Sequence, residues 1–407
     1  MKLWLTIISI IYFVIVAITL LYFLRINTNI KEKLSDKYLQ MLPNEPFVSI
    51  IVPTLNEANN IEKCLTSLRS LDYSNYEIIL SDGGSTDNTI DLAKPFVDQV
   101  VVEKSLPKGW IGKNYGCHIG YNIAKGEILL FTDADTVHKP ESLRIFVSTL
   151  LEKKIGLLTA FPYQELRKWW ESIVPIYFYL SNISSGGIKN VNDPKEDDSF
   201  LGIGQYLLFT REAYNKIGGH ERIKGSIIED YAFARIVKKQ LHSLYYLPTY
   251  KLVTAHMYPD SFRHSWTGFK KVLYAGTKLT PAKRIFLVLN TNLAIISSPI
   301  LLVLTALFAE SIVWLIVMSC TYLLLASTFA IYWNKKGRHF WLTYLLFPLL
   351  MSGFMFTLIS STLELVFSKK TTWKGRKYEP DLNAGLNGSY KTHDDEHLKT
   401  NIISLKE

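Results

Sequence analysis

The sequence predicts an α/β domain with a mostly parallel sheet, placed between transmembrane helices at both ends of the chain. Three observations support this prediction. Residues 47–260 alternate short apolar strands with helical patterns, residues 3–24 carry no charge, and three more apolar stretches follow residue 284. Strands that alternate with helices favour parallel pairing through right-handed crossovers.

The apolar stretches at the two ends are long enough to cross a membrane. A helix needs about 20 apolar residues to span the hydrocarbon core, and residues 3–24 meet this length. Arg25 follows without the small residues of a cleavage site, so the stretch is a retained anchor rather than a signal peptide. The C-terminal candidates are 285–309, 312–333 and 340–367. We therefore expect a multi-pass protein of the plasma membrane that contacts membrane lipids.

Basic residues predict which side of the membrane the central domain faces. Lysine and arginine are enriched in cytoplasmic loops, and here they follow the first span and precede the second, at Arg25, Lys31, Lys33, Lys37, Lys278, Lys283 and Arg284. The central domain is therefore expected in the cytosol. The last apolar stretch allows two topologies. A single crossing puts the basic tail outside, whereas a re-entrant hairpin broken at Pro348 and Gly353 keeps it in the cytosol, and we favour the hairpin.

The expected domain organisation follows from these patterns. It comprises an anchor (1–25), a linker (26–46), the α/β domain (47–260), an amphipathic helix (261–284), transmembrane helices (285–367) and a polar cytosolic tail (368–407). The amphipathic helix has apolar residues at Phe262, Trp266, Phe269 and Leu273, a spacing suited to the membrane interface. Core packing is the alternative for this helix. Residues 166–183 are a second aromatic-rich candidate for contact with lipid.

The net charge of +9 does not indicate a nucleic-acid-binding protein, because the basic clusters flank membrane segments and suit anionic lipid headgroups. Three scattered cysteines, Cys64, Cys117 and Cys320, provide neither a disulfide framework nor a metal cluster.

Acidic residues gather where the predicted parallel strands end. Glu57, Asp82, Asp133 and Asp135 lie at or just after such ends, where ligands bind in open α/β sheets. Carboxylates suit Mg²⁺ or Mn²⁺, which substrate phosphates often complete. The alternative interpretation is that Asp135 and Thr136 begin a helix that includes His138.

Together these segments resemble the family 2 glycosyltransferases with a GT-A fold. The resemblance covers about residues 47–260 and rests on VPTLNEANNIEKCLTSL, ILSDGGSTDNT, LLFTDAD and GSIIEDYAFAR, in that order. Further segments resemble the subgroup that acts on carotenoid and hopanoid-type lipids, namely LPKGWIGKNYGC, GIGQYLLFTREAYNKIGGH, MYPDSF and TWKGRKY.

The resemblance implies roles for individual residues. Asp230 is the expected general base with Glu229 beside it, and Asp133 and Asp135 are expected to hold the metal and the diphosphate. The expected nucleotide-sugar contacts are Pro53, Asn56, Glu57, Asp82, Lys113 and Asp133, and the expected acceptor side comprises Gly219, His220 and Trp266. Structural alternatives remain for several of them: Pro53 as a strand end, Glu57 as a helix start, Glu229 and Asp230 as an ordinary first helical turn, and Lys113 as part of a glycine-rich packed helix.

The chain departs from the family pattern at two places. Ser81 stands where an acid usually precedes the nucleotide-contacting aspartate, and the usual Q-x-x-R-W motif is replaced by RHSWTGFKK, residues 263–271.

The sequence thus predicts a membrane-bound, inverting glycosyltransferase that moves a sugar from a nucleotide-sugar, expected to be a UDP-hexose, to a lipid such as a carotenoid acid or alcohol. A polyprenyl-phosphate glycosyltransferase or a polysaccharide synthase is the alternative within the enzyme class. A membrane transporter or a nucleotide-binding scaffold is the alternative outside it. Glu364 is the main charge within the apolar stretches, which argues against transport because transport pathways need ionisable groups inside the membrane.

Overall fold

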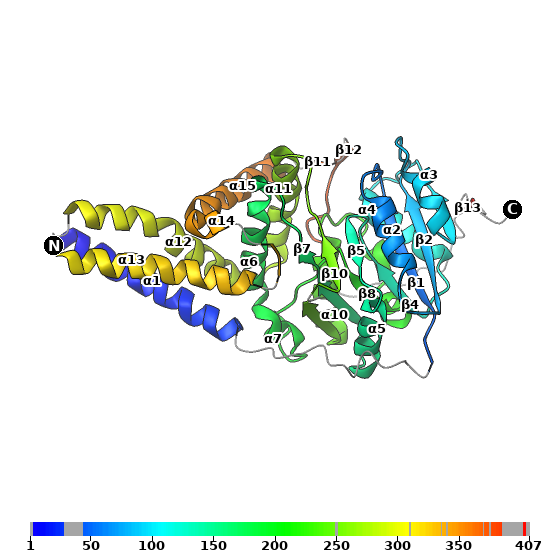
Figure 1. The fold of residues 1–407 in the computed structure, drawn as a ribbon, viewed down its shortest axis with the longest axis horizontal. Helices are drawn as coiled ribbons and strands as arrows, with labels where there is room; N and C mark the ends of the chain where they lie inside the picture. The colour runs from blue at the N-terminus through cyan, green and yellow to red at the C-terminus, as the bar shows by residue number, and fades with distance from the viewer. Residues whose placement is uncertain are drawn as a thin grey trace. The chain divides into compact units, whose positions relative to one another are not determined.

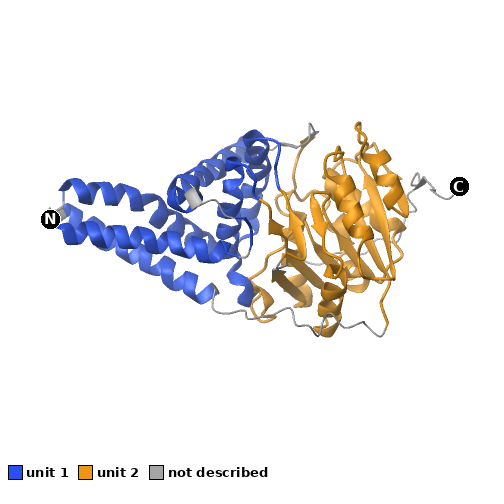
Figure 2. Ribbon diagram, viewed as in Figure 1, with its two compact units in different colours: residues 1–30, 166–190, 257–368 blue, residues 31–165, 191–256, 369–407 orange. Residues whose placement is uncertain are grey.

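The structure is a computed structural model that describes residues 3–27, 44–248, 251–308, 311–334, 336–338, 341–368, 370–373, 376–384 and 402–403. It divides into two compact units (Figure 2). The helical unit comprises residues 1–30, 166–190 and 257–368, and the sheet unit comprises residues 31–165, 191–256 and 369–407. Residues 166–190, which we expected inside the α/β domain, thus group with the apolar helices. Positions 31, 33 and 37 of the expected basic flank, and most of the tail, lie outside the described residues.

The sheet unit is built on a mixed, mostly parallel sheet, which confirms the predicted fold class. Its strand order is β13-β3-β2-β1-β4-β8-β6-β9. Neighbours from β3 to β4 pair in parallel, as do β6 and β9, whereas β8 is antiparallel to β4 and β6, and β13 is antiparallel to β3. The strands are β1 (Val48–Thr54), β2 (Tyr76–Asp82), β3 (Gln99–Val102), β4 (Ile128–Phe131), β6 (Leu157–Phe161), β8 (Leu207–Thr210), β9 (Leu244–Pro248) and β13 (Ile402–Ile403).

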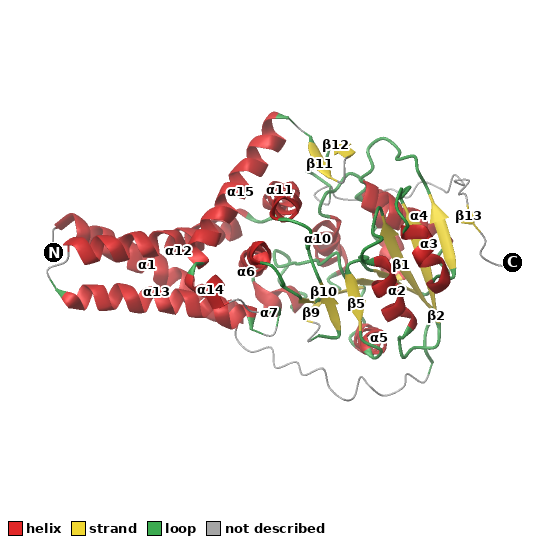
Figure 3. Cartoon of the chain, turned by 45° about the horizontal axis from the view of Figure 1, so that its top comes forward, coloured by secondary structure: helices red, strands yellow, loops and turns green. Residues whose placement is uncertain are grey.

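Helices cover both faces of this sheet (Figure 3). On one face, α2 buries Ile61, Cys64, Leu65 and Leu68 in the same core as Ile50, Val52 and Leu80, at the spacing of one helical face. On the other face lies α4, where a Cβ at Gly120 would come within 2.6 Å of Ile51 Cγ2. The helices of this unit are α2 (Ile61–Arg69), α3 (Thr89–Ala93), α4 (Gly112–Ile123), α5 (Ser142–Glu152), α8 (Arg211–Lys216), α9 (Gly219–Arg222) and α10 (Glu229–Leu241), with the 3-10 turn η2 (Lys94–Phe96). The short helix α7 (Gly187–Asn192) joins the two units in sequence.

A small second sheet determines the geometry after β4. It contains β5 (Thr136–His138), β10 (Val253–Ala255) and β7 (Tyr163–Gln164), with β5 antiparallel to β10. The chain after Asp135 is therefore extended, and the next helix begins only at Ser142. The alternative interpretation that Asp135 begins a helix is wrong, because pairing with β10 holds this segment as a strand.

Among its described residues, the helical unit contains four helices that are long and apolar enough to cross a membrane, within α1, α12, α13 and α15 (Figure 1). Its elements are α1 (Leu3–Asn27), η3 (Trp169–Ser172), α6 (Ile173–Ser185), α11 (Phe262–Leu279), α12 (Ala282–Phe308), α13 (Ile312–Trp333), α14 (Trp341–Leu345) and α15 (Phe347–Phe367). Buried polar contacts tie α1 to α12, since the Asn290 amide donates to Ile15 O at 3.1 Å and to Thr19 Oγ1 at 3.0 Å.

The break expected within the last apolar stretch at Pro348 and Gly353 is wrong. Residues Phe347–Phe367 form one continuous helix. Pro348 lies in its first turn, where the missing N–H has no intrahelical partner to lose and the fixed φ suits a helix start. The actual interruption lies at Leu346, between α14 and α15.

Candidate active site

Two loops at the ends of β1 and β2 are bound to each other. The Asn56 backbone N–H donates to Ser85 Oγ at 2.8 Å, and the Asn56 side-chain oxygen accepts from the Thr86 N–H at 2.9 Å. Asn56 itself adopts a positive φ of 53°, which asparagine tolerates better than most residues. The Glu57 N–H donates to Thr89 Oγ1 at 2.7 Å. The segments that follow β1 and β2 therefore form one double loop, which includes Asn56 and Glu57 and begins on the β2 side at Asp82. Pro53 is the next-to-last residue of β1.

Asp82 is fully buried, and both of its carboxylate oxygens have protein partners. Oδ1 accepts the N–H groups of Gly84 and Ser85 at 2.8 and 2.7 Å. Oδ2 accepts the hydroxyls of Thr54 and Ser85 at 2.9 and 2.6 Å. A carboxylate offers about four lone-pair sites, so these bonds use its acceptor capacity to shape the double loop.

A second set of acids is joined by one lysine at the start of α4. The Lys113 ammonium lies 2.6 Å from Asp133 Oδ1 and 2.7 Å from Glu229 Oε1. Burial alone would lower the pKa of Lys113, but Asp133 and Glu229 outweigh burial and raise it well above its ordinary value. Lys113 therefore stays charged and links the loop after β4 to the first turn of α10.

Asp135 lies in the same electrostatic environment as Asp133. Burial, followed by the charges of Asp133 and Glu57, raises the pKa of Asp135 to about 7. Burial also raises the pKa of Asp133, although Lys113 opposes the shift. The structure thus brings Glu57, Asp133 and Asp135 close enough to repel one another, which favours binding of a cation there.

Asp230 completes the group from the first turn of α10. Its Oδ2 accepts the Gly204 N–H at 2.8 Å, and its Oδ1 accepts its neighbour's N–H, that of Tyr231, at 2.7 Å. Burial and then the charge of Glu229 raise the pKa of Asp230 to about 7. Glu229 and Asp230 do occupy a first helical turn, and the same placement directs them towards Lys113 and Gly204.

Sequence reasoning missed three residues that shape this cluster. A Cβ at Gly204 would lie 2.9 Å from Glu229 Oε1 and 3.0 Å from Lys113 Nζ, so only glycine leaves these atoms their space. The Gln205 amide nitrogen lies 3.4 Å from each oxygen of Asp135. The buried Asn114 amide nitrogen lies 2.8 to 3.2 Å from the carbonyls of Ile223, Lys224 and Ser226, on the segment that leads into α10. The glycine pair in GIGQ was the available signal for Gly204 and Gln205.

Each residue expected on the acceptor side has contacts within its own unit. His220 is buried, with Nδ1 2.7 Å from Tyr214 OH and its ring against Phe131 and Phe233. Burial lowers the pKa of His220 well below its ordinary value, so it is a neutral, packed side chain. Gly219 has a positive φ of 49° against the Tyr214 ring. Trp266 belongs to the helical unit, where it contacts Phe356.

A divalent cation fits the acids by their chemistry. The described residues include no group of three or more His, Cys, Asp or Glu side chains that could hold a metal ion by themselves. Mg²⁺ and Mn²⁺ sites of this kind often use only one or two carboxylates, with phosphate oxygens of the substrate as further ligands. Asp133 and Asp135 supply such a pair of hard oxygen donors. A cation bound to them would relieve the repulsion between the two carboxylates.

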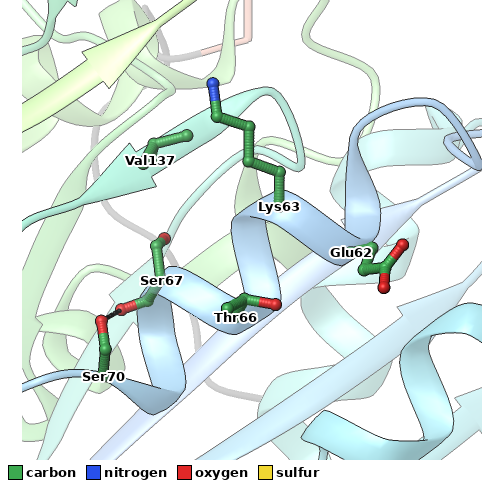
Figure 4. Close-up of a pocket in the computed structure, with 6 residues that line it drawn as sticks. All are labelled: Glu62, Lys63, Thr66, Ser67, Ser70 and Val137. Carbon is green, nitrogen blue, oxygen red and sulfur yellow. Dashed lines mark hydrogen bonds between the residues drawn. The ribbon is translucent and has the colours of Figure 1, made fainter.

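An open pocket elsewhere on the sheet unit contains none of the predicted site residues. Its lining comes from the outer side of α2 and from β5, with Glu62, Lys63, Thr66, Ser67, Ser70 and Val137 (Figure 4). It therefore contributes nothing to the acid cluster.

Comparison with known proteins identifies the domain that carries these acids. Residues 49–218 match the sequence model of glycosyl transferase family 2. This segment is a family 2 glycosyltransferase domain. It contains the double loop, Lys113, Asp133, Asp135 and Gly204, while Glu229 and Asp230 follow it closely in the chain.

The glycosyltransferase is also similar to curated proteins over most of its length. The 4,4'-diaponeurosporenoate glycosyltransferases of Staphylococcus aureus strains N315 and USA300 are each 25% identical over 353 residues, which cover 86% of this chain and 92% of the relative. Among solved structures, the mannosyltransferase PcManGT from Pyrobaculum calidifontis, in complex with GDP-Man and Mn2+, matches with a TM-score of 0.54. That match has 17% sequence identity and covers 90% of this chain and 99% of PcManGT, so it supports the shared GT-A fold.

Proposed function

We propose that this glycosyltransferase is a membrane-bound, inverting enzyme that transfers a hexose from a nucleotide-sugar, with UDP as the expected nucleotide, to a lipid carboxylic acid or alcohol of the carotenoid type. One observation carries the proposal. A single lysine, Lys113, links the acid expected at the donor diphosphate, Asp133, to the helical turn that bears the expected base, Asp230. Donor and acceptor chemistry thus converge on one cluster.

The donor half consists of the double loop and the two aspartates. Asp133 and Asp135 would hold Mg²⁺ or Mn²⁺, which supplies Lewis-acid stabilisation of the departing nucleoside diphosphate when bound. Pro53, Asn56 and Glu57 border the space for the nucleoside, and Asp82 keeps that loop in shape through its four internal hydrogen bonds. Lys113 adds a fixed positive charge beside the diphosphate position.

The acceptor half depends on Asp230. A base has to remove the proton of an acceptor hydroxyl as it attacks, and a base works best when its pKa lies near the working pH. The pKa of Asp230, raised to about 7, meets this condition. For a carboxylic acid acceptor, which is already ionised, the protonated form of Asp230 would orient the nucleophile by donating a hydrogen bond to it. Direct attack opposite the leaving group inverts the anomeric carbon.

The lipid class is inferred from the relatives and from the helical unit. The named substrate of the curated relatives is 4,4'-diaponeurosporenoate, a carotenoid acid. In the helical unit, Trp169 has 71% of its surface exposed and stacks on the exposed Phe262 with ring centroids 5.9 Å apart. Exposed aromatic pairs of this kind suit the membrane interface, where such an acceptor is dissolved.

Although four helices in the described part of the chain are long enough to cross the membrane, we infer that three of them do so: α1, α12 and α13. The segment after α13 runs back along that helix. Arg338 O accepts the Trp333 indole N–H at 3.0 Å, the Tyr344 ring lies 5.7 Å from Phe329, and the Phe347 ring lies 5.5 Å from Tyr322. Tyr322 lies halfway along α13. The chain therefore reaches only the middle of α13 before α15 begins.

The helix α15 then returns along the amphipathic helix α11. The Trp266 ring lies 5.4 Å from Phe356, the Tyr274 N–H donates to Ser361 Oγ at 3.1 Å, and Lys270 pairs with Glu364 at 2.5 Å. An ion pair of this kind is better tolerated at the interface than at the bilayer centre. Helices α14 and α15 thus form a re-entrant hairpin that turns at Leu346.

The position of the tail supports this topology independently. After α15 the chain forms the hairpin of β11 (Thr371–Trp373) and β12 (Arg376–Tyr378). The Asp381 N–H then donates to Gly225 O at 2.9 Å, within the sheet unit. Because α12 and α13 make one outward and one return crossing, a fourth crossing would put the tail on the side opposite Gly225. We therefore place the tail on the catalytic side, in the cytosol.

The function is tested by incubating membranes that contain the full-length protein with UDP- and GDP-hexoses and analysing the lipid extract by mass spectrometry. The expected result is a gain of one hexose on a long-chain acid or alcohol. A hexose on a polyprenyl phosphate would replace our acceptor with the alternative class. If the protein neither hydrolyses nor transfers hexose from any of the donors, the enzymatic proposal is contradicted.

The topology is tested with protease-sensitive tags, one inserted in the sheet unit after Asp193 and one placed after Glu407. In sealed vesicles both tags should be cleaved when the cytosolic face points outward, and both should be protected when it points inward. Opposite protection of the two tags would establish a fourth crossing and contradict the hairpin.

A further inference from the structure

Gln205 occupies a fixed position beside the acid cluster, although nothing in the family pattern used above assigns it a task. It is 5% exposed and directly precedes Tyr206 and β8. Its carbonyl oxygen accepts the Thr132 hydroxyl at 2.8 Å. Thr132 immediately precedes Asp133, so this bond fixes the distance between the Gln205 backbone and the loop after β4.

A second glutamine determines which way the Gln205 amide points. The Gln164 side-chain NH₂ donates to Pro162 O at 3.1 Å and to Gln205 Oε1 at 3.2 Å, which uses both of its hydrogens. Oxygen and nitrogen of an amide are assigned from such networks. With its oxygen occupied by Gln164, the Gln205 amide presents its NH₂ to Asp135, 3.4 Å from each carboxylate oxygen.

This arrangement suits a carboxylate that has to bind a cation. Because the amide nitrogen is equally far from both carboxylate oxygens, it orients the whole Asp135 carboxylate. Neither oxygen is taken up by a short hydrogen bond, so both can still bind a cation. A neutral donor also leaves the negative charge of Asp135 uncompensated, whereas a lysine or arginine at this position would form an ion pair with it. Asp133 differs in this respect, because Lys113 already neutralises part of its charge.

We propose that Gln205 is a positioning residue that holds the Asp135 carboxylate ready for a divalent cation, and that Gln164 acts through Gln205 by fixing its amide. The proposal rests on the metal site of the proposed function. Partners that orient metal ligands in this way typically change metal affinity or activity by about 10- to 100-fold when removed.

The test measures Mn²⁺ binding to the full-length, detergent-purified protein by electron paramagnetic resonance of free Mn²⁺, with UDP or GDP present. Gln205→Met keeps the side-chain length and removes the amide, and it should weaken Mn²⁺ binding by about tenfold or more. Gln164→Met should weaken binding in the same direction by less. The double variant should be no worse than Gln205→Met alone, because residues in one network do not act additively.

A matched control exists on the same sheet. The Gln99 amide donates to the buried Glu77 at 2.8 Å, in a pair that makes no contact with the acid cluster among the described residues. Gln99→Met should lower thermal stability without changing Mn²⁺ affinity. Mn²⁺ binding by folded Gln205→Met equal to wild type, or an equal loss in Gln99→Met, would overturn the proposal.

Failure of the proposed function is distinguishable from failure of this inference. If wild-type protein transfers hexose but binds no Mn²⁺ with either nucleotide, the metal site and the role of Gln205 are both wrong, while the transferase proposal stands. If wild type binds Mn²⁺ and the Gln205 and Gln164 variants match it, only the positioning role is wrong. If Gln205→Met does not fold, Gln164→Met alone decides, since loss of Mn²⁺ affinity supports the proposal and wild-type affinity overturns it.

Discussion

Replacing Asp230 with asparagine should separate catalysis from binding, because the structure gives this carboxylate two distinct tasks. One is to accept two backbone N–H groups, from Gly204 at 2.8 Å and Tyr231 at 2.7 Å. The other is to act as the base. Asparagine keeps one acceptor oxygen but presents an NH₂ to the second N–H. An unpaired backbone N–H costs about 1–3 kcal/mol when buried, and Asp230 is partly exposed, so we expect a stability loss of about 1 kcal/mol.

The catalytic loss should be much larger. General acid–base catalysis contributes about 10²- to 10⁴-fold to the rate, which corresponds to roughly 3–5 kcal/mol in the barrier. The wild-type kcat/KM should also fall about tenfold per pH unit below the pKa of the base, and here that pKa is raised to about 7. The residual rate of the variant should lack this acid limb, because no carboxylate at position 230 remains to be protonated.

The assay compares kcat/KM from pH 5 to 9 with the donor and acceptor found in the lipid screen, alongside Mn²⁺–nucleotide binding. Asp98→Asn is a matched control, since Asp98 accepts the Ile78 N–H at 2.8 Å and pairs with Arg69 at 2.8 Å near the opposite end of β2. It should lose stability and retain turnover. Turnover by Asp230→Asn at the wild-type rate, with the acid limb unchanged, would remove Asp230 from the mechanism.

Three further predictions follow from the same cluster. Without divalent cations, thermal stability should fall as pH rises from about 4 to about 7. The pKa values of Asp135 and Asp230 in the folded protein are both raised to about 7, so the unfolded chain releases these protons at lower pH than the folded protein does. Mn²⁺ should reduce the fall, and a melting temperature that does not change with pH would contradict the raised pKa values. Gly204→Ala should lower kcat at least tenfold, which corresponds to an activation barrier raised by about 1.4 kcal/mol, because the new Cβ would lie 2.9 Å from Glu229 Oε1. Gly276→Ala is the control: its Cβ would meet nothing within 4 Å, so this variant should keep the wild-type rate. Lys113→Met should lower the melting temperature of the ligand-free protein more at pH 8 than at pH 5, since Asp133 and Glu229 lose their shared partner. As the control, Lys94→Met breaks only the exposed ion pair with Asp91 and should change the melting temperature little. Equal melting curves for wild type and Lys113→Met would assign Lys113 to substrate phosphates alone.

The sequence was sufficient for the parts of the fold that depend on local pattern. The apolar strands, the helical patterns between them and the long apolar stretches reflect the period of a strand or a helix or the thickness of a bilayer. The structure confirms the elements that these patterns predict. The grouping of residues 166–190 with the helical unit was not predicted, because their aromatic pattern is local, whereas this grouping depends on contacts with distant residues. One such contact is the Tyr22 hydroxyl donating to Ile183 O at 3.0 Å.

Side-chain partners in the site were harder to predict for a related reason. Four rim acids were expected to act together, but Asp82 accepts hydrogen bonds from Thr54, Gly84 and Ser85, which no spacing rule reveals. The sequence motif that contains Gly204 and Gln205 did not indicate what either residue does. Gly204 is important because the absence of a side chain leaves room for neighbouring atoms. Those atoms belong to Lys113 and Glu229, which are distant from it in sequence.

The break expected in the last apolar stretch was misplaced, whereas the side of the tail remains a prediction. Proline and glycine are local signals, and they suggested a turn at Pro348 and Gly353. The turn at Leu346 instead follows from tertiary contacts, since Phe347 packs against Tyr322 in the middle of α13. The basic charge of the tail is a global signal about the membrane, and it agrees with the bond between Asp381 and Gly225. Gly225 begins the segment that leads to Glu229 and Asp230, so the tail contacts the chain next to the proposed base, and a fourth crossing would require this contact to break.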